Sequence, residues 1–121
     1  MISLNRVMIA GKVGNNPTLH ETASGRKFSD FNIVITDCWK DRNGETMKKS
    51  TFINVCCWGS LAENVVKYLT KGKSAMVEGR IETDTYIDDN GKKHYITKIN
   101  ASNIVFLESD RKKSKGEENV F

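Results

Sequence analysis

Hydrophobic residues along this chain fall in short runs that alternate with polar residues, and clusters of Gly, Asn and Asp separate the runs. Alternation with a period of two places successive side chains on opposite faces, as in a half-buried β-strand. The pattern predicts five strands, over residues 5–13, 28–37, 51–58, 75–81 and 94–107. The chain is therefore predicted to be mostly β.

Two tight turns are predicted from Asn-Gly pairs within residues 41–44 and 88–91. Asn-Gly tolerates the positive φ angles of hairpin turns, so each segment is expected to end a protruding β-hairpin. The second segment partly matches a calcium loop. Its first and last ligand positions would be Tyr86 and Thr97, neither of which has a carboxylate, so no calcium site is expected.

One helix is predicted over residues 61–71, where apolar residues recur every three or four positions. Ser60 followed by Glu63 has the spacing of a capping box, and Gly72 has the position of a left-handed C-terminal residue. Three strands, a helix and two strands is the order of an OB-fold, a closed five-stranded barrel plugged at one end by the helix. Other small β-barrels share this order.

Size and composition are those of one domain, because 121 residues with 38% apolar residues suffice for a single core. That domain is expected over residues 1–107, and residues 108–121 are expected to form a short flexible charged tail. No run is apolar and long enough to cross a membrane, and three cysteines with no pairing pattern favour reduced thiols in a cytoplasm. The net charge of +4 suits a nucleic-acid partner, and the whole excess lies before residue 108.

Two aromatic residues in the third predicted strand lie on the face that the core does not explain. Alternation over residues 51–58 places Ile53, Val55 and Cys57 in the barrel core and Phe52 and Trp58 on the opposite face. A ligand or a subunit must cover these two rings.

Trp39 and Tyr86 precede the two predicted turns, so four aromatic residues are expected to share one side and to stack on DNA bases. Each stacked base contributes about 1–3 kcal/mol whatever its identity. Trp39 has a competing interpretation, since it continues the odd-numbered core positions of its strand unless a β-bulge intervenes.

Basic residues near these aromatics are candidates for neutralising phosphates. They are Arg6, Lys12, Lys40, Arg42, Lys48, Lys49, Lys71, Lys73, Arg80, Lys92 and Lys93. The competing interpretation is that they are ordinary solvated side chains.

Catalysis is not predicted. His20 and His94 lie in separate segments without a nucleophile motif, and no phosphate-binding glycine loop precedes the helix. We expect no catalytic residue, no metal and no cofactor.

Many short motifs, in order, resemble bacterial single-stranded DNA-binding proteins over residues 1–107. The matching segments are Asn5-Arg6-Val7 leading to Gly11, Gly14-Asn15-Asn16-Pro17, Ser24-Gly25, residues 52–59, Leu61-Ala62-Glu63, Tyr68-Leu69 with Lys71-Gly72, and Val77-Glu78-Gly79-Arg80-Ile81. The resemblance implies a cytoplasmic, nucleoid-associated homotetramer, of cellular, phage or plasmid origin, that binds single-stranded DNA without sequence preference in replication, recombination and repair. It also implies base stacking at the same four aromatic positions.

Two features depart from or extend this resemblance. Glu82, Asp84 and the pair at 88–89 place acid on the second hairpin, where family members are often basic. The chain ends with an acidic tip and a terminal Phe, which resembles the segment by which the family recruits replication and repair enzymes. Its docking residues would be Glu117, Glu118, Val120 and Phe121, and a frayed end without a partner is the alternative.

Three other functions remain open from sequence alone: a dimeric OB-fold protein of primosome assembly, an RNA-binding OB module, and a structural oligomerisation domain whose aromatics are subunit contacts.

Overall fold

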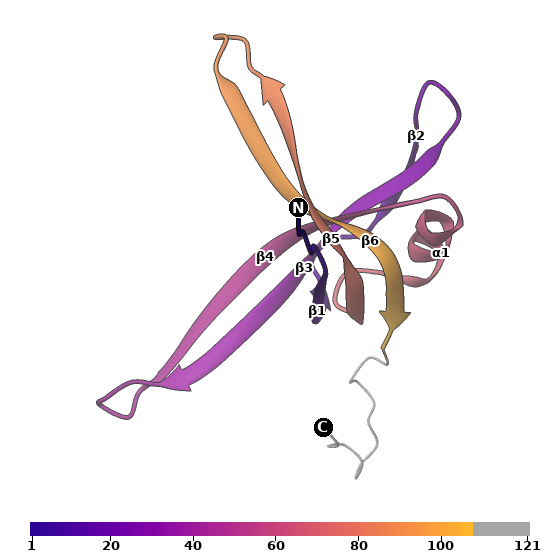
Figure 1. Cartoon of the computed structure of the whole chain (residues 1–121). Helices are drawn as coiled ribbons and strands as arrows, with labels where there is room; N and C mark the ends of the chain where they lie inside the picture. The colour runs from indigo at the N-terminus through magenta and orange to yellow at the C-terminus, as the bar shows by residue number, and fades with distance from the viewer. Residues whose placement is uncertain (108–121) are drawn as a thin grey trace.

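The computed structural model describes residues 1–107, which form six strands and one helix (Figure 1). The elements are β1 (Val7–Val13), β2 (Thr18–Glu21), β3 (Lys27–Lys40), β4 (Thr46–Trp58), α1 (Ser60–Tyr68), β5 (Ser74–Ile87) and β6 (Lys93–Phe106). All five predicted strands are present, most of them longer than the apolar pattern indicated. The sixth, β2, was not predicted.

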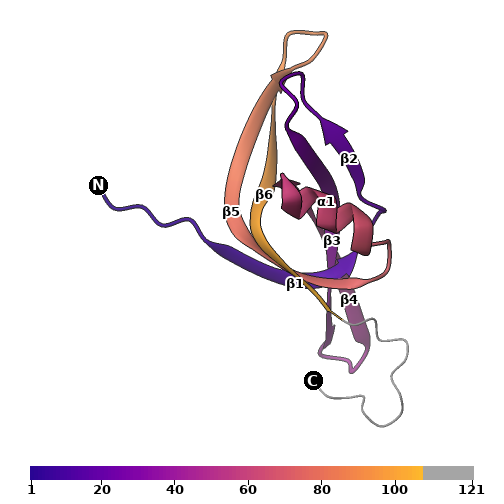
Figure 2. The same ribbon diagram turned by 90° about the vertical axis from the view of Figure 1, so that its right-hand side faces the viewer.

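The strands close into a barrel. Their order is β1-β5-β6-β4-β3, and β1 pairs again with β3 through Lys12 with Val34 and Val13 with Ile33. β2 pairs only with β3, and α1 lies across one end of the barrel (Figure 2). The predicted OB-fold, a closed five-stranded barrel with one helix, is confirmed.

The core fills the barrel beneath α1, which contributes one stripe of apolar side chains to it. The buried apolar residues are Val13, Phe31, Ile33, Val55, Cys57, Ala62, Val65, Leu69, Ala75, Val77, Ile99, Ala101 and Ile104. On β4 the odd-numbered positions face inward, as the alternation predicted.

Two glycines allow neighbouring strands of the barrel to approach closely. A Cβ at Gly11 would collide with the backbone carbonyl of Val34, where β1 crosses to β3. A Cβ at Gly79 would collide with the carbonyl of Asn100, beside the irregularity in the β5–β6 register. Larger residues at these positions would force neighbouring strands apart.

The predicted helix ends were wrong at both termini. The residue before the first turn is Gly59, with φ of 68°, and no side chain caps the helix, so Ser60 and Glu63 do not form a capping box. Glu63 instead lies 3.5 Å from the Lys27 ammonium. The helix closes at Leu69, whose backbone is extended, and Gly72 belongs to the turn before β5 with its N–H donating to a β1 carbonyl.

Three hairpins, β2–β3, β3–β4 and β5–β6, project from the barrel in different directions (Figure 1). The two predicted Asn-Gly turns are confirmed and are built alike. Asp41 and Asp88 each accept, through Oδ1, the N–H groups two and four residues further on, and Gly44 and Gly91 have φ of 81° and 80°. A loop of the same type therefore ends each of the two long hairpins.

No helix within residues 1–107 is long and apolar enough to cross a membrane.

Candidate nucleic-acid interface

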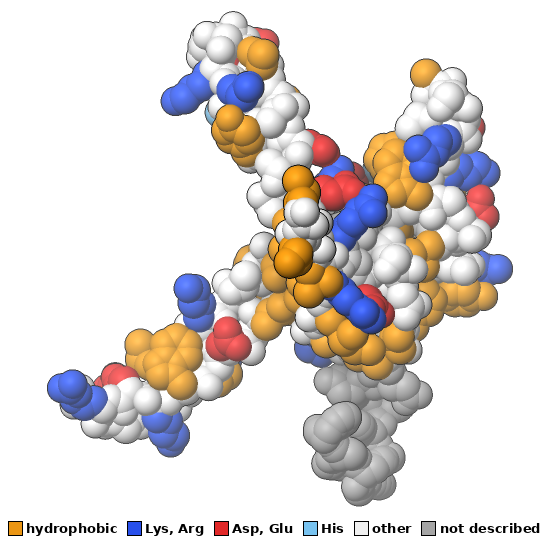
Figure 3. Space-filling view, in the orientation of Figure 1, with side chains coloured by type: hydrophobic (Ala, Val, Ile, Leu, Met, Phe, Trp, Pro, Cys, Tyr) orange, Lys and Arg blue, Asp and Glu red, His pale blue; other side chains and the backbone are white. Residues whose placement is uncertain are grey.

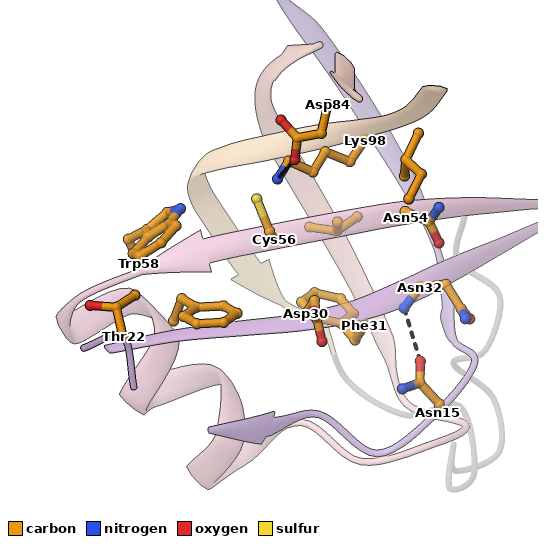
Figure 4. Close-up of a pocket in the computed structure, with 13 residues that line it drawn as sticks. Asn15, Thr22, Asp30, Phe31, Asn32, Asn54, Cys56, Trp58, Asp84 and Lys98 are labelled. Carbon is orange, nitrogen blue, oxygen red and sulfur yellow. Dashed lines mark hydrogen bonds and ion pairs between the residues drawn. The ribbon is translucent and has the colours of Figure 1, made fainter. Parts of the chain in front are cut away.

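A groove of about 550 Å³ lies between the β2–β3 and β5–β6 hairpins (Figure 4). Trp58 stands at one end of the groove and Asn15 at the other, while Asp84 and Lys98 form the wall contributed by β5 and β6. The floor is the outer face of β3 and β4. The groove is thus an outer concave surface, separate from the apolar core.

Strand register explains why these side chains share one face. Phe28, Asp30 and Asn32 on β3 lie directly opposite Trp58, Cys56 and Asn54 on β4. Directly opposed residues on neighbouring strands point to the same side, and alternate residues along a strand do so too. Even-numbered residues of both strands therefore line the groove.

Phe52 continues this outer face toward the tip of the β3–β4 hairpin, and its side chain is 67% exposed. Val55 and Cys57, between the outward residues, are buried. The prediction that Phe52 and Trp58 lie opposite the core face is confirmed. Burial within the barrel does not account for either ring.

Trp58 is the end of a row of rings that crosses three strands. His20 lies opposite Phe28, and Phe28 lies opposite Trp58. The ring centroids are 5.0 Å apart for His20 and Phe28 and 4.9 Å apart for Phe28 and Trp58. This row makes Trp58 half-buried and fixes the indole at the mouth of the groove.

Arg26 contacts the indole as well, with its guanidinium carbon 4.3 Å from the Trp58 ring centroid. Cations over a Trp ring are attracted by the ring quadrupole. The sequence prediction missed Arg26, Phe28 and Lys98. Arg26 and Phe28 lie one residue before and one residue after Lys27, where β3 begins. Recognising them required the pairing of β3 with β4 and with β2, the strand that the sequence did not predict.

Trp39 lies far out on the β3–β4 hairpin, opposite Met47, and is 47% exposed. The register of β3 and β4 has no bulge, so Trp39 is on the pleat face of Ile33 and Ile35 and not on that of Phe52. It is nevertheless outside the core because the hairpin has left the barrel. The expectation that all four aromatics share one face is therefore wrong for Trp39.

Tyr86 occupies the equivalent place on the β5–β6 hairpin, two residues before its turn, and is 49% exposed. Its ring stacks on that of His94, directly opposite, at a centroid distance of 4.9 Å. His94 Nε2 is 2.7 Å from Asp88 Oδ2. The hydrogen bond from His94, together with the turn N–H groups of Lys92 and Asn90, lowers the pKa of Asp88.

Glu82 and Asp84 of the β5–β6 hairpin have partners within the hairpin. Glu82 accepts hydrogen bonds from Asn100 at 3.1 Å and from Arg80 at 3.0 Å, and these lower its pKa. Asp84 pairs with Lys98 at 2.5 Å, which raises the pKa of Lys98. Among the acidic residues that depart from the family pattern, Glu82, Asp84 and Asp88 thus each have a partner within the hairpin.

The predicted phosphate-binding cations are spread over four places and do not converge on one spot. Lys40, Arg42, Lys48 and Lys49 are on the β3–β4 hairpin, Lys92 and Lys93 near the β5–β6 turn, Lys71 and Lys73 between α1 and β5, and Arg6, Lys12 and Arg80 in or beside β1 and β5. Blue side chains mark both long hairpins in Figure 3.

Several of these cations have partners within residues 1–107. Arg6 Nε donates to Glu78 at 2.9 Å, Arg80 pairs with Glu82, and Lys73 Nζ donates to the Tyr68 carbonyl at 3.3 Å. Contacts with phosphates would compete with these bonds. The predicted docking residues Glu117, Glu118, Val120 and Phe121 lie outside the described residues.

Comparison with known proteins gives a consistent result. Residues 4–107 match the model of the single-strand binding protein family. The chain is 35% identical over 117 residues to a single-stranded DNA-binding protein of Halalkalibacterium halodurans, covering 97% of this chain and 68% of that one. It is 34% identical over 113 residues to single-stranded DNA-binding protein 2 of Listeria monocytogenes, covering 93% and 69%.

Among solved structures, the chain is similar to one described as a Plasmodium falciparum SSB complex with ssDNA. The TM-score is 0.80 at 26% identity, over 89% of this chain and 98% of that chain.

Proposed function

This chain belongs to the single-strand binding protein family, and from that premise we propose that it binds and protects single-stranded DNA, without sequence preference, in replication, recombination and repair. Bases stack on its aromatic side chains while Lys and Arg side chains neutralise the phosphates. No step of this function is catalytic, and no cofactor is involved.

The observation that supports this mechanism best is the outer face of β4 shared by Phe52 and Trp58, next to the groove, with Tyr86 exposed on the neighbouring β5–β6 hairpin. Each base has a π face, so exposed rings accept any base at about 1–3 kcal/mol per stack. We propose that Trp39 stacks as well, on the far part of the β3–β4 hairpin, where its exposure leaves the indole accessible.

Cations of the two long hairpins provide the electrostatic part of binding. Lys48 and Lys49 lie on opposite faces of the β3–β4 hairpin, and Lys92 and Lys93 lie beside the β5–β6 turn. Long-range attraction from these side chains brings the DNA strand onto the aromatic side chains, and neutralisation of its phosphates releases counterions.

Tryptophan fluorescence during titration with oligo(dT) tests this function. Trp39 and Trp58 are the two tryptophans of the chain, so stacking should quench its emission to a saturating level. Oligo(U) and duplex DNA of matched length are the competitors. Absence of quenching and of any mobility shift with oligo(dT) would contradict the proposal, and stronger binding of oligo(U) would favour an RNA-binding module.

We propose the homotetramer as the working assembly. Apolar side chains that a further copy would cover are exposed on several elements, among them Met8 on β1, Tyr68 on α1 and Phe106 on β6. Light scattering coupled to size exclusion should give four times the mass of the 13.6 kDa chain. Twice that mass would favour the primosome-type dimer.

The tail has a proposed function of its own. Glu117, Glu118, Val120 and the carboxylate of Phe121 would dock on a replication or repair enzyme through a basic-rimmed apolar pocket. Deleting residues 119–121 should abolish capture of such enzymes and leave oligo(dT) affinity the same or tighter. We place this activity in the cytoplasm, at the nucleoid.

A further inference from the structure

The Trp58 indole is already contacted by two side chains before any DNA binds. The Arg26 guanidinium carbon is 4.3 Å from the ring centroid, and the Phe28 ring is 4.9 Å away at an interplanar angle of 34°. Phe28 is half-buried on β3 and is backed by His20. Arg26 is exposed and precedes the strand. A base that stacks fully on Trp58 therefore meets a fixed ring and a movable cation.

The backbone of Arg26 is held in place by a tight turn. Its N–H donates to Thr22 Oγ1 at 3.1 Å, and its carbonyl accepts the Thr22 N–H at 2.8 Å. The Gly25 N–H donates to the Thr22 carbonyl at 2.9 Å, and Gly25 has φ of 91°. Rearrangement at Arg26 is consequently a change of side-chain rotamer, in which the guanidinium moves by about 3.4 Å, the spacing of stacked bases.

Charge singles out Arg26 among the cations around this end of the groove. Lys27 pairs with Glu63, and Lys98 pairs with Asp84. Within residues 1–107, by contrast, the Arg26 guanidinium makes no ion pair and its recorded contact is the indole ring. Leaving the ring for another π surface therefore breaks no ion pair.

The groove itself disfavours phosphates at this end. Its lining includes the carboxylates of Asp30 and Asp84 and one ammonium, that of Lys98. A bound DNA strand should turn its bases toward this surface and keep its phosphates at the rim, because like charges repel. A cation next to Trp58 then faces a base more readily than a phosphate.

Building on the proposed function, we propose that Arg26 is a base clamp. When a base stacks on Trp58, the guanidinium moves off the indole and closes over the outer face of the same base, so that the base is held between the indole and the guanidinium plane. Guanidinium planes stack on bases as aromatic rings do. Arg26 thereby acts as a binding residue for bases, distinct from the lysines that neutralise phosphates.

Arg26→Ala and Arg26→Lys, both in a Trp39→Phe background, test this clamp with Trp58 as the single fluorophore. Arg26→Ala should weaken oligo(dT) binding about 2- to 30-fold, the range expected for a cation–π contact. Arg26→Lys, which keeps the charge and loses the plane, should recover only part of that loss. The salt slope of log Kd should stay that of the parent, whereas a lost phosphate contact reduces it by about 0.7.

Lys67→Ala is the matched control, because Lys67 lies over the Tyr68 ring at 5.5 Å on α1, away from the groove. It should leave affinity at the parent value. Unchanged or tighter binding by Arg26→Ala would identify Arg26 as a passive cover of Trp58 and overturn the clamp. Weaker binding with a reduced salt slope, restored fully by Arg26→Lys, would identify a phosphate contact and overturn it equally. Failure of the Trp39→Phe parent and the unmodified protein to bind oligo(dT) would contradict the proposed function itself.

Discussion

Phe28 and Trp58 face each other across β3 and β4, with ring centroids 4.9 Å apart. The pair links the two proposals of base stacking and clamping, because Phe28 sets the position of the indole on which a base would stack. His20, on the edge strand β2, extends the row and supports Phe28 from behind. A short strand that adds little to the core thus helps to position the candidate binding surface.

Substitution of Trp58 by Ala should weaken oligo(dT) binding by about 1–3 kcal/mol. Phe28→Ala should give a smaller loss, because the indole remains but loses one of its two contacts. Both losses can be measured by a titration that does not depend on tryptophan emission, such as the fluorescence anisotropy of labelled oligo(dT).

Leu19→Ala is the control for these two variants. Leu19 is exposed on the β2–β3 hairpin, and its side chain points to the opposite face of β2 from that of His20. Its affinity should match the unmodified protein. If Trp58→Ala retains full affinity while circular dichroism shows an intact fold, stacking on Trp58 is wrong.

Salt dependence should distinguish the cations of the β3–β4 hairpin from those held in ion pairs. Lys48→Ala and Lys49→Ala should each lower the salt slope by about 0.7 if the side chain neutralises one phosphate. Arg6→Ala should change the slope less, because Arg6 already pairs with Glu78. Slopes of Lys48→Ala and Lys49→Ala equal to that of the unmodified protein would mean that the hairpin lysines do not contact the backbone of the DNA strand.

Thiol labelling should separate the three cysteines by burial. Cys38 is exposed on the β3–β4 hairpin, whereas Cys56 and Cys57 are buried. Burial raises the pKa of Cys57 to about 12 and also raises that of Cys56, so neither is a thiolate near neutral pH.

Intact mass after brief treatment with a maleimide at pH 7 should show one label on the folded protein and three after denaturation. Rapid addition of three labels to the folded protein would show that β4 opens on that timescale, because Cys57 faces the core whereas Cys56 lines the groove.

Strand patterning predicted the barrel and much of the candidate surface, since alternation over residues 51–58 correctly separated Phe52 from Val55. The pattern did not predict strand segments whose residues lie outside the barrel and are exposed. β2 has four exposed residues and hence no apolar period, and the hairpin segments of β3 and β5 lose their pattern once they leave the barrel. Trp39 keeps the parity of a core residue for the same reason, although its side chain is 47% exposed.

The helix ends and Arg26 needed tertiary information that local motifs do not contain. Ser60 and Glu63 have capping-box spacing, but the positive φ of Gly59 turns the chain sharply from β4 into α1 and leaves Glu63 to pair with Lys27. Arg26 becomes a neighbour of Trp58 only through the pairing of β3 with β4. Spacing along the chain does not reveal such a contact.

The β5–β6 hairpin should carry a pH-dependent contribution to stability from Asp88. The hydrogen bond from His94 and the turn N–H groups lower the pKa of Asp88 below its ordinary value of 3.8. A depressed folded-state pKa means that the folded protein binds the proton less readily than the unfolded chain does. The stabilisation is therefore fully present above about pH 4 and is lost as the pH falls through the folded-state pKa.

Asp88→Asn isolates this effect, because its side-chain oxygen still accepts the two turn N–H groups while the titrating carboxylate is gone. Between pH 5.5 and 2.5, the free energy of unfolding of the unmodified protein, relative to Asp88→Asn, should fall with decreasing pH, since protonation of Asp88 is the step that the variant lacks. A carboxyl NMR titration of His94→Gln should in parallel show the pKa of Asp88 moving up toward 3.8, because the largest cause of its depression is removed. A stability difference that stays constant over this pH range, with an Asp88 pKa unaffected by His94→Gln, would mean that the 2.7 Å contact between the two side chains does not persist in solution.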